Sequence, residues 1–433
     1  MTGRATSKRA VTCGAGLALV LSAVTAAGGD TFDKHKKWLQ VGPSPSAIVA
    51  VDLNEDGLPE IVTADTGSMR DPREEKPAND ELSFLVALGD LEYERKTPFR
   101  AGFAPYAVAV ANMDALKAPD LVVVSFMAIS YRDVPTRNLL PAQDVALFRN
   151  MGDGLFESIY YHVPDEALPY NRVRDGDEQP VFTKPGLTSL AVGQLDGNRQ
   201  RDVVATAWSS DALVFLPGSA ETYLGEPRTI AAAGGPRDVK VADFDNDGHL
   251  DLAVVLYSSH ELGLWRGDGA GGFEPVTRFD TRGKLPSKLQ VADINGDGRL
   301  DLAVSHCYTD DSVVLFYGDG DFSFSTSQEI LLGEHRDILE REIRDLIVAD
   351  LNGDDKADLA AACYGPAEVE VLMNASESSA LPQQFEHETY VYEAAKPRAL
   401  CAADFNADGA TDLGVALWEA NAVSLLLGKR TKK

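Results

Sequence analysis

The 433-residue sequence contains only four cysteines and seven histidines, and neither type occurs at a spacing typical of a metal site or a redox pair. It also lacks a nucleophile elbow, a phosphate-binding P-loop and a zinc-protease helix, so no familiar catalytic motif is present. Basic residues are scarce: 40 lysines and arginines stand against 67 aspartates and glutamates, for a formal net charge of −27. So acidic a chain repels a phosphate backbone, and we therefore expect no nucleic-acid partner.

Only one long apolar run occurs, and it lies near the N-terminus. Residues 15–24 follow three basic residues and lead into a stretch of small residues. This order is typical of a secretory signal peptide, and we predict residues 1–27 to be one, with cleavage near Ala26 or Ala27. A retained anchor is the alternative, although the run is short for a bilayer span. We therefore expect a secreted, periplasmic or cell-surface protein with no integral membrane span after signal cleavage.

A nine-residue loop recurs seven times along the chain. Its best copy reads Asp-Phe-Asp-Asn-Asp-Gly-His-Leu-Asp and lies between short β-branched runs. The copies begin 49 to 82 residues apart, which is about the length of a four-stranded propeller blade. The seven copies occupy residues 52–60, 112–120, 194–202, 243–251, 293–301, 350–358 and 404–412.

The spelling of the loop indicates a calcium site. Positions 1, 3, 5 and 9 carry side-chain oxygens, and position 7 can add a backbone carbonyl; hard oxygens in a flexible arrangement suit calcium. Glycine at position 6 permits a sharp turn. The flanking runs are typical of strands, whereas an EF-hand needs helices. The predicted ligands are Asp52, Asn54, Asp56, Leu58 and Glu60; Asp243, Asp245, Asp247, His249 and Asp251; Asp293, Asn295, Asp297, Arg299 and Asp301; Asp350, Asn352, Asp354, Lys356 and Asp358; and Asp404, Asn406, Asp408, Ala410 and Asp412.

Two copies depart from this pattern. The second has Leu116 at ligand position 5 and Lys117 in the turn, and the third has Gln194 at position 1 and Arg199 in the turn. The sixth copy has Asp355 in the glycine position but keeps its ligand residues. We therefore predict about five calcium ions. The alternative is that all seven loops are polar turns without a metal.

Together with Gly-Asp-Gly turns such as residues 267–269 and 318–320, the loops resemble the FG-GAP repeat, also called the VCBS repeat, of the integrin alpha-chain N-terminal propeller. The resemblance covers nearly all of residues 32–428, and we predict a propeller domain over residues 31–428. It implies an all-β, seven-bladed β-propeller with calcium loops between the first and second strands of each blade, on the lower face. It implies no single activity.

Counting strands predicts how the ring closes. The last blade has three strands, at residues 398–404, 412–418 and 422–427, and residues 31–41 form a strand with no blade of its own. We predict that residues 31–41 complete blade 7 and remove its open edge. A basic tail, residues 429–433, follows the propeller.

The three cysteines beyond the signal segment, Cys307, Cys363 and Cys401, fall in predicted strands. The simpler interpretation is that they are small buried residues. A disulfide between Cys307 and Cys363, in adjacent blades, is the alternative.

In the FG-GAP propeller the start of each first strand rims the upper mouth of the central channel, and this position holds three arginines here. Three guanidinium groups around one funnel suit a carboxylate, sulfate or phosphate ligand. The alternative is that they pair with Asp238, Glu342 and Asp345 and only close the ring. The proposed ligand-binding residues are Tyr106, Arg237, Arg344 and Arg398.

Two further features fall on the upper face. Long insertions at residues 66–81, 128–144 and 163–186 are of a length that is often functional. Aromatic residues end most second strands, as blade-packing core or as a sugar-stacking surface; they are Phe126, Trp208, Tyr257, Tyr364 and Trp418.

These features favour a non-enzymatic binding or adhesion module that uses its upper face for a protein or an acidic glycan. The alternative is a polysaccharide-cleaving enzyme, a lyase or hydrolase, with its site in the upper central funnel and a tyrosine or arginine as base. A passive scaffold is a third possibility.

Overall fold

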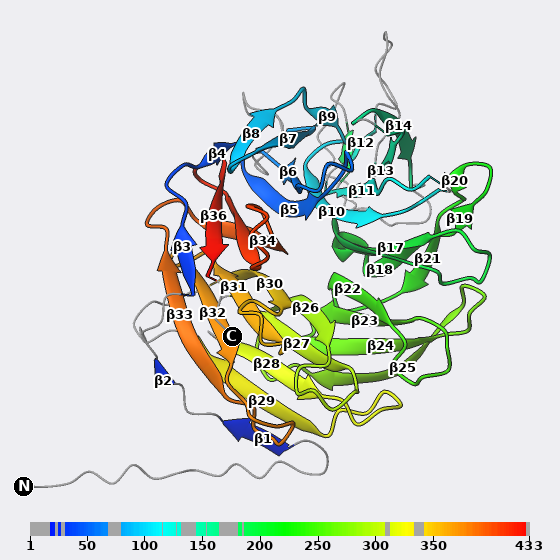
Figure 1. Ribbon diagram of the computed structural model, residues 1–433. Coiled ribbons are helices and arrows are strands. Elements are labelled where there is room, and N and C mark those ends of the chain that lie inside the picture. The colour runs from blue at the N-terminus through cyan, green and yellow to red at the C-terminus, as the bar shows by residue number, and fades with distance from the viewer. Residues whose placement is uncertain are drawn as a thin grey trace, which may run out of the picture.

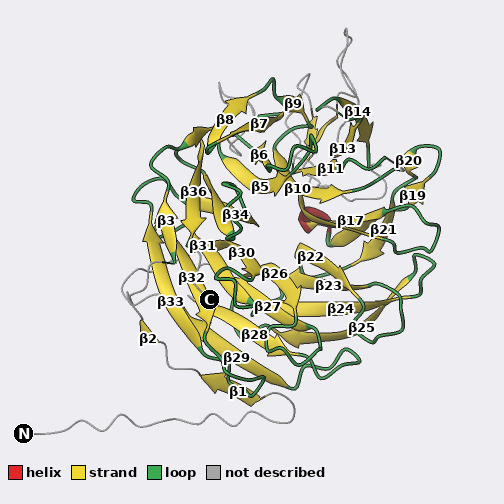
Figure 2. Ribbon diagram, in the orientation of Figure 1, coloured by secondary structure: helices red, strands yellow, loops and turns green. Residues whose placement is uncertain are grey.

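The computed structural model describes residues 18–21, 25–26, 31–67, 79–114, 116–126, 128–130, 144–152, 154–163, 181–183, 186–307, 312–332 and 342–429. They form seven sheets of four or five strands, arranged as blades around a central axis (Figure 1), and two further two-stranded sheets. Strands make up almost all of the regular structure (Figure 2), and the only helix among the described residues is the 3-10 turn η1 (Trp208–Ser210). None of the described residues lie in a helix long and apolar enough to cross a membrane. The predicted all-β, seven-bladed β-propeller is confirmed.

Each blade begins with its innermost strand, and neighbouring innermost strands contact one another around the whole ring. Each of the seven is preceded by a residue in the left-handed region, at φ between 48° and 70°. The chain therefore makes the same turn into every blade. The innermost strands are β5 (Pro45–Val51), β10 (Pro105–Ala111), β16 (Leu187–Gly193), β22 (Pro236–Ala242), β26 (Pro286–Ala292), β30 (Ile343–Ala349) and β34 (Pro397–Ala403).

The second strand of every blade is buried along its whole length, because other strands and the neighbouring blades cover it on all sides. These strands are β6 (Glu60–Asp65), β11 (Asp120–Ser125), β17 (Asp202–Ala207), β23 (Asp251–Leu256), β27 (Asp301–His306), β31 (Asp358–Cys363) and β35 (Asp412–Leu417). The third strands are β7 (Glu81–Gly89), β13 (Val145–Asn150), β18 (Ala212–Leu216), β24 (Glu261–Gly267), β28 (Ser312–Tyr317), β32 (Glu368–Asn374) and β36 (Ala422–Gly428).

The outer strands are more exposed. They are β8 (Glu92–Arg95), β14 (Phe156–Tyr161), β21 (Arg228–Ala231), β25 (Phe273–Asp280), β29 (Thr326–Leu331) and β33 (Phe385–Val391), with β3 (Phe32–Lys34) in blade 7. A short strand β9 (Phe99–Arg100) also pairs with β7, and β19 (Gly218–Ser219) pairs with β20 (Tyr223–Leu224) in a hairpin of blade 3.

The core consists mainly of seven apolar layers, each shared by two neighbouring blades. Leu264 of blade 4, for example, belongs to one layer with Phe316 of blade 5. The layer between blades 7 and 1 contains Phe405 of blade 7 and Ile61 of blade 1, so the ring is packed all the way round. No blade buries an apolar core of its own, which is why the repeat folds only as a ring.

The N-terminal strand closes this ring, as predicted. Strand β3 pairs antiparallel with β36, the third strand of blade 7, and β4 (Leu39–Gln40) pairs with the same strand farther along. The predicted single strand over residues 31–41 is therefore two short strands. Closure through β3 hides the edge of β36 that would otherwise be open.

Most of the predicted signal peptide lies outside the described residues. The described part comprises two short strands, β1 (Ala18–Leu21) and β2 (Thr25–Ala26), which pair in parallel with the outer strands β29 and β33. The signal peptide thus stays a prediction, as does the basic tail, of which only Lys429 is described.

The long insertions of blade 2 meet one another. β12 (Ala128–Ser130) belongs to the predicted insertion 128–144 and pairs antiparallel with β15 (Val181–Thr183), which belongs to the insertion 163–186. Most of both insertions, and residues 68–78 of the insertion in blade 1, lie outside the described residues.

All three described cysteines are free thiols, and the alternative of a bridge between Cys307 and Cys363 is not realised.

His387 on β33 makes the stability of the propeller acid-sensitive. Neither ring nitrogen has a hydrogen-bond partner among the described residues, and burial lowers the pKa of His387 to about 4. The unfolded chain, with a histidine pKa of about 6.5, therefore takes up the proton first as the pH falls. This contribution to stability is complete above pH 6.5 and is lost as the pH falls towards 4; we expect a decrease of about 2 kcal/mol in unfolding free energy by pH 5.

The variant His387→Gln should lack this component. Urea denaturation of the native protein and the variant at about pH 8 and about pH 5 measures it as the difference between the two losses. Equal losses in both proteins would show that His387 does not carry the effect.

Candidate functional site

The five intact loops share one hydrogen-bond pattern. In each, the carboxylate at position 1 accepts the backbone N–H groups of positions 5 and 6, at 2.8–3.2 Å. In the fourth loop, for example, Asp243 accepts from Asp247 and Gly248. The residue at position 6 has a left-handed φ in all five, including +66° at Asp355, where glycine is absent. The five copies with the intact pattern thus share one turn geometry.

Carboxylate oxygens converge in two of these five loops. One carboxylate oxygen from each of Asp243, Asp245 and Asp247 lies within 4.8 Å of the others, and so do those of Asp350, Asp354 and Asp358. Arg266 pairs with Asp245 at 2.7 Å and offsets part of the repulsion among the three carboxylates of the fourth loop; a bound cation would offset more of it. The donor set, all oxygen and mainly carboxylate, is of the kind that Ca²⁺ prefers. The residues therefore fit calcium, and its binding stays a prediction.

The carboxylate at position 9 has a structural task in all seven copies. It is fully buried in every blade and accepts the N–H of position 2, at 2.6–2.9 Å. In the six aspartate copies, its other oxygen accepts an N–H at the end of the third strand, at 2.5–2.9 Å. This residue joins the first and third strands whether or not a metal is present, which explains why the degenerate copies keep Asp120 and Asp202.

The two degenerate loops differ where the sequence predicts. Asn112 and Gln194 at position 1 accept neither of the two turn N–H groups among the described residues. Asn112 instead donates to the carbonyl of Leu116. Position 3 of the second loop, Asp114, is bound by the Nε and Nη2 atoms of Arg149 at 2.9 and 2.8 Å. The intact fourth loop has the same kind of contact, from the Arg266 Nε atom to Asp245 at 2.7 Å, so this arginine does not set the degenerate loop apart.

The four proposed ligand-binding residues of the upper face come together around Tyr106. The Nη2 atoms of Arg237 and Arg398 donate to the Tyr106 hydroxyl, at 3.0 and 2.7 Å. Arg398 also donates to the backbone carbonyl of Arg344, at 3.3 Å. Blades 2, 4 and 7 are thus joined across the axis by three side chains. We refer to Tyr106, Arg237, Lys288, Arg344 and Arg398 as the upper mouth cluster.

Electrostatics in the upper mouth cluster are unusual. Burial alone would raise the pKa of Tyr106, but the positive charges of Arg237, Arg398, Arg344 and Lys288 outweigh it and lower this pKa to about 7. The phenol is therefore partly ionised near neutral pH. Tyr106 and Arg398 are each only 6% exposed, whereas Arg237 and Arg344 are half-buried.

The aromatic residues after the second strands pack on these arginines. The Arg237 guanidinium carbon lies 5.6 Å from the ring centre of Trp208 and 5.3 Å from that of Tyr257. Arg398 lies 5.7 Å from the Trp418 ring, and Arg344 lies 5.6 Å from the Tyr364 ring. All four rings are half-buried, so they serve as packing for the cations and still present part of their surface.

Arg344 pairs with Glu342 at 2.6 Å, which is one of the ion pairs that the sequence suggests. Asp238 and Asp345 instead lie near Lys240 at 3.9 Å and Lys288 at 3.5 Å.

The sequence patterns described above do not identify Lys288 as a residue of this site. Its signal was a charged residue at the same register in three consecutive blades, one position after the rim residue of each: Asp238, Lys288 and Asp345.

Comparisons with known proteins agree with the fold. A family model described as FG-GAP-like repeat matches residues 194–254, 253–304 and 293–361. No curated protein sequence matches the chain significantly.

Among solved structures, BBS1N in complex with ARL6DN is 14% identical, with 92% of this chain and 98% of that chain covered and a TM-score of 0.55. A virginiamycin B lyase from Staphylococcus aureus is 10% identical, with coverages of 92% and 99% and a TM-score of 0.55. A putative 6-phosphogluconolactonase from Bacteroides fragilis is 14% identical, with coverages of 82% and 86% and a TM-score of 0.53. At these identities the likeness concerns the fold alone. The architecture shows that this chain is a seven-bladed β-propeller, and the family matches show FG-GAP-like repeats within residues 194–361.

Proposed function

We propose that this protein is secreted, binds calcium in its five intact lower-face loops and acts as a non-enzymatic binding module for acidic glycans through the upper mouth cluster. The observation that carries the proposal is the gathering of four cations around one buried tyrosine, with half-buried aromatic rings beside them, in a chain whose net charge is −27. The four cations outnumber the neighbouring carboxylates of Asp238, Glu342 and Asp345, and the remaining positive charge favours an anionic ligand there.

The residues of the cluster and the aromatic residues beside it would have different roles in binding. Arg237 and Arg344 keep part of their surface exposed and would donate to a carboxylate or sulfate group. Trp208 and Tyr257 would offer their exposed edges and faces to sugar rings. Arg398 is nearly buried and bonded to Tyr106, so it would position the tyrosine and not touch the glycan.

Calcium binding and secretion are both compatible with a glycan-binding role for the upper mouth cluster. Ions in the lower-face loops would fix the junction between the first and second strands and so hold the rim residues, which begin the first strands, in register. Extracellular fluid supplies calcium at concentrations that suit exposed loops of this type. The N-terminal segment supports export by its order of basic, apolar and small residues.

A second candidate function, an acidic-polysaccharide lyase, has one observation in its favour. A tyrosine with a pKa of about 7 beside two arginines suits abstraction of the proton α to a uronate carboxylate, with loss of the glycosidic oxygen from the β carbon. Burial of Tyr106 and the two guanidinium groups on its hydroxyl oppose this, because a substrate would have to displace them. Binding without turnover is therefore the better supported function.

Native-gel migration through acidic polysaccharides tests the proposal. With about 1 mM calcium, we expect hyaluronate or chondroitin sulfate in the gel to retard the native protein, and dextran to leave its migration unchanged. Arg344→Ala should weaken binding about tenfold or more, because a charge-assisted hydrogen bond contributes about 1.5–3 kcal/mol. Arg95→Ala, which removes an exposed arginine from the outer strand β8, is the matched control and should be retarded like the native protein.

Free migration in every acidic polymer, or equal retardation of native protein and Arg344→Ala, would rule out the upper mouth as a glycan site. Protein pull-downs would then be the next experiment. Shortened polymer, with the ultraviolet absorbance of an unsaturated product that Tyr106→Phe abolishes, would replace the binding module by the lyase.

A further inference from the structure

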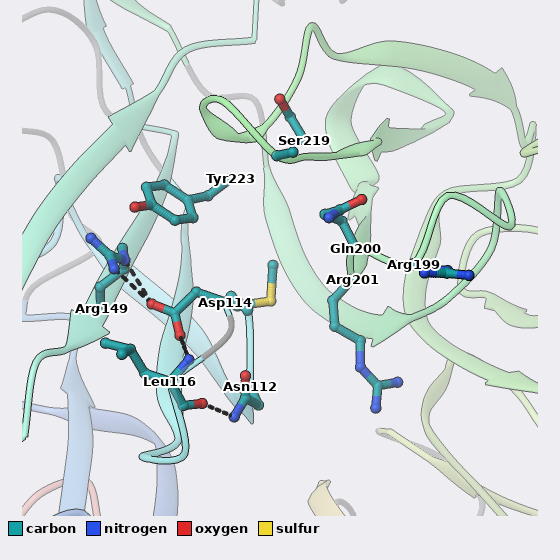
Figure 3. A pocket seen from close by; sticks show the side chains of 11 residues that line it. Asn112, Asp114, Leu116, Arg149, Arg199, Gln200, Arg201, Ser219 and Tyr223 are labelled. Atoms are coloured by element: carbon teal, nitrogen blue, oxygen red, sulfur yellow. Dashed lines mark hydrogen bonds and ion pairs between the residues drawn. The ribbon is translucent and has the colours of Figure 1, made fainter.

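The two degenerate loops border a pocket on the lower face, away from the upper mouth cluster. The cavity measures about 650 Å³ and lies between the loop of blade 2 and that of blade 3, beside the β19–β20 hairpin. In Figure 3, Arg149, Asp114 and Tyr223 form one wall and Gln200 lies opposite, while the side chains of Arg199 and Arg201 extend away from Tyr223 at the edge of the pocket. Its volume falls within the roughly 300–1,000 Å³ typical of sites for small molecules. We refer to it as the lower-face pocket.

The charge of the lower-face pocket is opposite to that of the intact loops. Its lining has three arginines and one acidic residue, Asp114. Arg149 already neutralises Asp114 with two hydrogen bonds, and the Asp114 side chain is only 6% exposed. Arg199 and Arg201 are exposed and have no hydrogen bond or ion pair to any of the described residues. Two unpaired guanidinium groups therefore remain for a ligand.

The opposite wall is preorganised. The Tyr223 ring covers the Arg149 guanidinium, with the Arg149 Cζ atom 4.2 Å from the ring centre. Arg149 also pairs with Glu157, so it is held on three sides. The Tyr161 hydroxyl donates to the carbonyl of Thr222 at 2.5 Å and thereby fixes the hairpin that carries Tyr223. A rigid aromatic wall lowers the entropy cost of binding a ring-shaped molecule.

From these observations we infer that the lower-face pocket binds a small carboxylate-bearing sugar, such as a uronate. The pocket lies beside the two degenerate loops, where other blades carry loops of the metal-binding type. Arg199 and Arg201 take the carboxylate, Gln200 bonds to hydroxyl groups, and the sugar ring lies against the wall of Tyr223. These two loops lack some of the metal-ligand residues and have arginines in or beside them instead. Both departures fit a loop that binds a sugar in place of a metal. This site is independent of the upper mouth cluster.

Isothermal titration calorimetry with galacturonate, in about 1 mM calcium, tests the inference. We expect binding that Arg201→Gln weakens about tenfold and that Arg199→Gln/Arg201→Gln abolishes, because each lost guanidinium removes a charge-assisted bond. Arg95→Gln on β8 is the matched control and should bind like the native protein. Both target side chains are exposed, so the variants should keep the native melting temperature.

Two further arms separate this site from the proposed function. Arg344→Ala, in the upper mouth cluster, should bind galacturonate at the lower-face pocket with unchanged affinity even where it no longer binds a polymer. Glucose should bind at least tenfold more weakly than galacturonate, since it lacks the carboxylate. No binding of galacturonate to the native protein, equal binding of glucose, or unchanged binding by the double arginine variant would each overturn the inference.

Discussion

Chelation of calcium is expected to lower the melting temperature of this protein by about 10 °C or more. A site with a dissociation constant of about 10 µM contributes about 2.7 kcal/mol of stability at about 1 mM calcium. Five such sites lie in one continuous ring, so their contributions act on the same cooperative unit. Without calcium, the converging carboxylates of Asp243, Asp245 and Asp247 also repel one another. Differential scanning calorimetry with and without EGTA measures the effect.

Loop variants assign the calcium effect to the loops. Asp243→Asn/Asp245→Asn should reduce the calcium-dependent part of the melting temperature by about a fifth, as expected for one site of five equal ones. Asn112→Ala, in the degenerate loop of blade 2, should leave that part unchanged. An identical melting temperature in calcium and in EGTA would show that the loops are polar turns without a metal.

Removing the N-terminal closing strand is expected to unfold the ring. A variant that begins at residue 43 lacks β3 and β4, exposes one edge of β36 and loses the apolar contacts of Phe32, Leu39 and Val41. Burial of such side chains contributes about 1.5–3 kcal/mol each. The N–H of Phe32 also donates to the Tyr390 hydroxyl at 2.9 Å, which links blade 7 to blade 6. We expect the variant to aggregate through the open edge.

A protein that begins at residue 28 lacks only the predicted signal peptide and keeps β3 and β4; it is the control, and it should stay folded and monomeric. Phe32→Ala tests the same strand within the intact chain, with an expected loss of about 3–5 kcal/mol in unfolding free energy. Asp33→Ala, at an exposed position of the same strand, should cost less than about 0.5 kcal/mol. A monomeric variant from residue 43 with the melting temperature of the control would show that closure through β3 is dispensable.

The sequence predicts the structure best where a feature depends only on neighbouring residues along the chain. Each nine-residue loop is a local structure, so its turn, its strand flanks and its ligand-type residues follow from a short stretch of chain. The seven copies then predict seven blades. The spare strand ahead of blade 1 and the missing strand of blade 7 predict closure, because an open edge is costly.

The loop pattern does not predict the full role of the residue at position 9. From the pattern alone, Asp251 is one more ligand residue. In the structure it also joins Phe244 to Gly267 through two backbone hydrogen bonds, at 2.8 and 2.9 Å. The sequence does not reveal this second task, because Gly267 belongs to another strand and the pairing depends on the register of the sheet.

The sequence by itself determined the repeat, the number of blades, the class of loop and the position of the closing strand, because these depend on short-range patterns and on strand counts. Only the tertiary structure decided what the rim residues contact. Tyr106, Arg237 and Arg398 belong to blades 2, 4 and 7 and meet only because the ring brings their strands to one axis. The lower-face pocket likewise needs the hairpin of blade 3 to lie over the loop of blade 2. Contacts between distant segments depend on how the blades pack, and no local pattern encodes that packing.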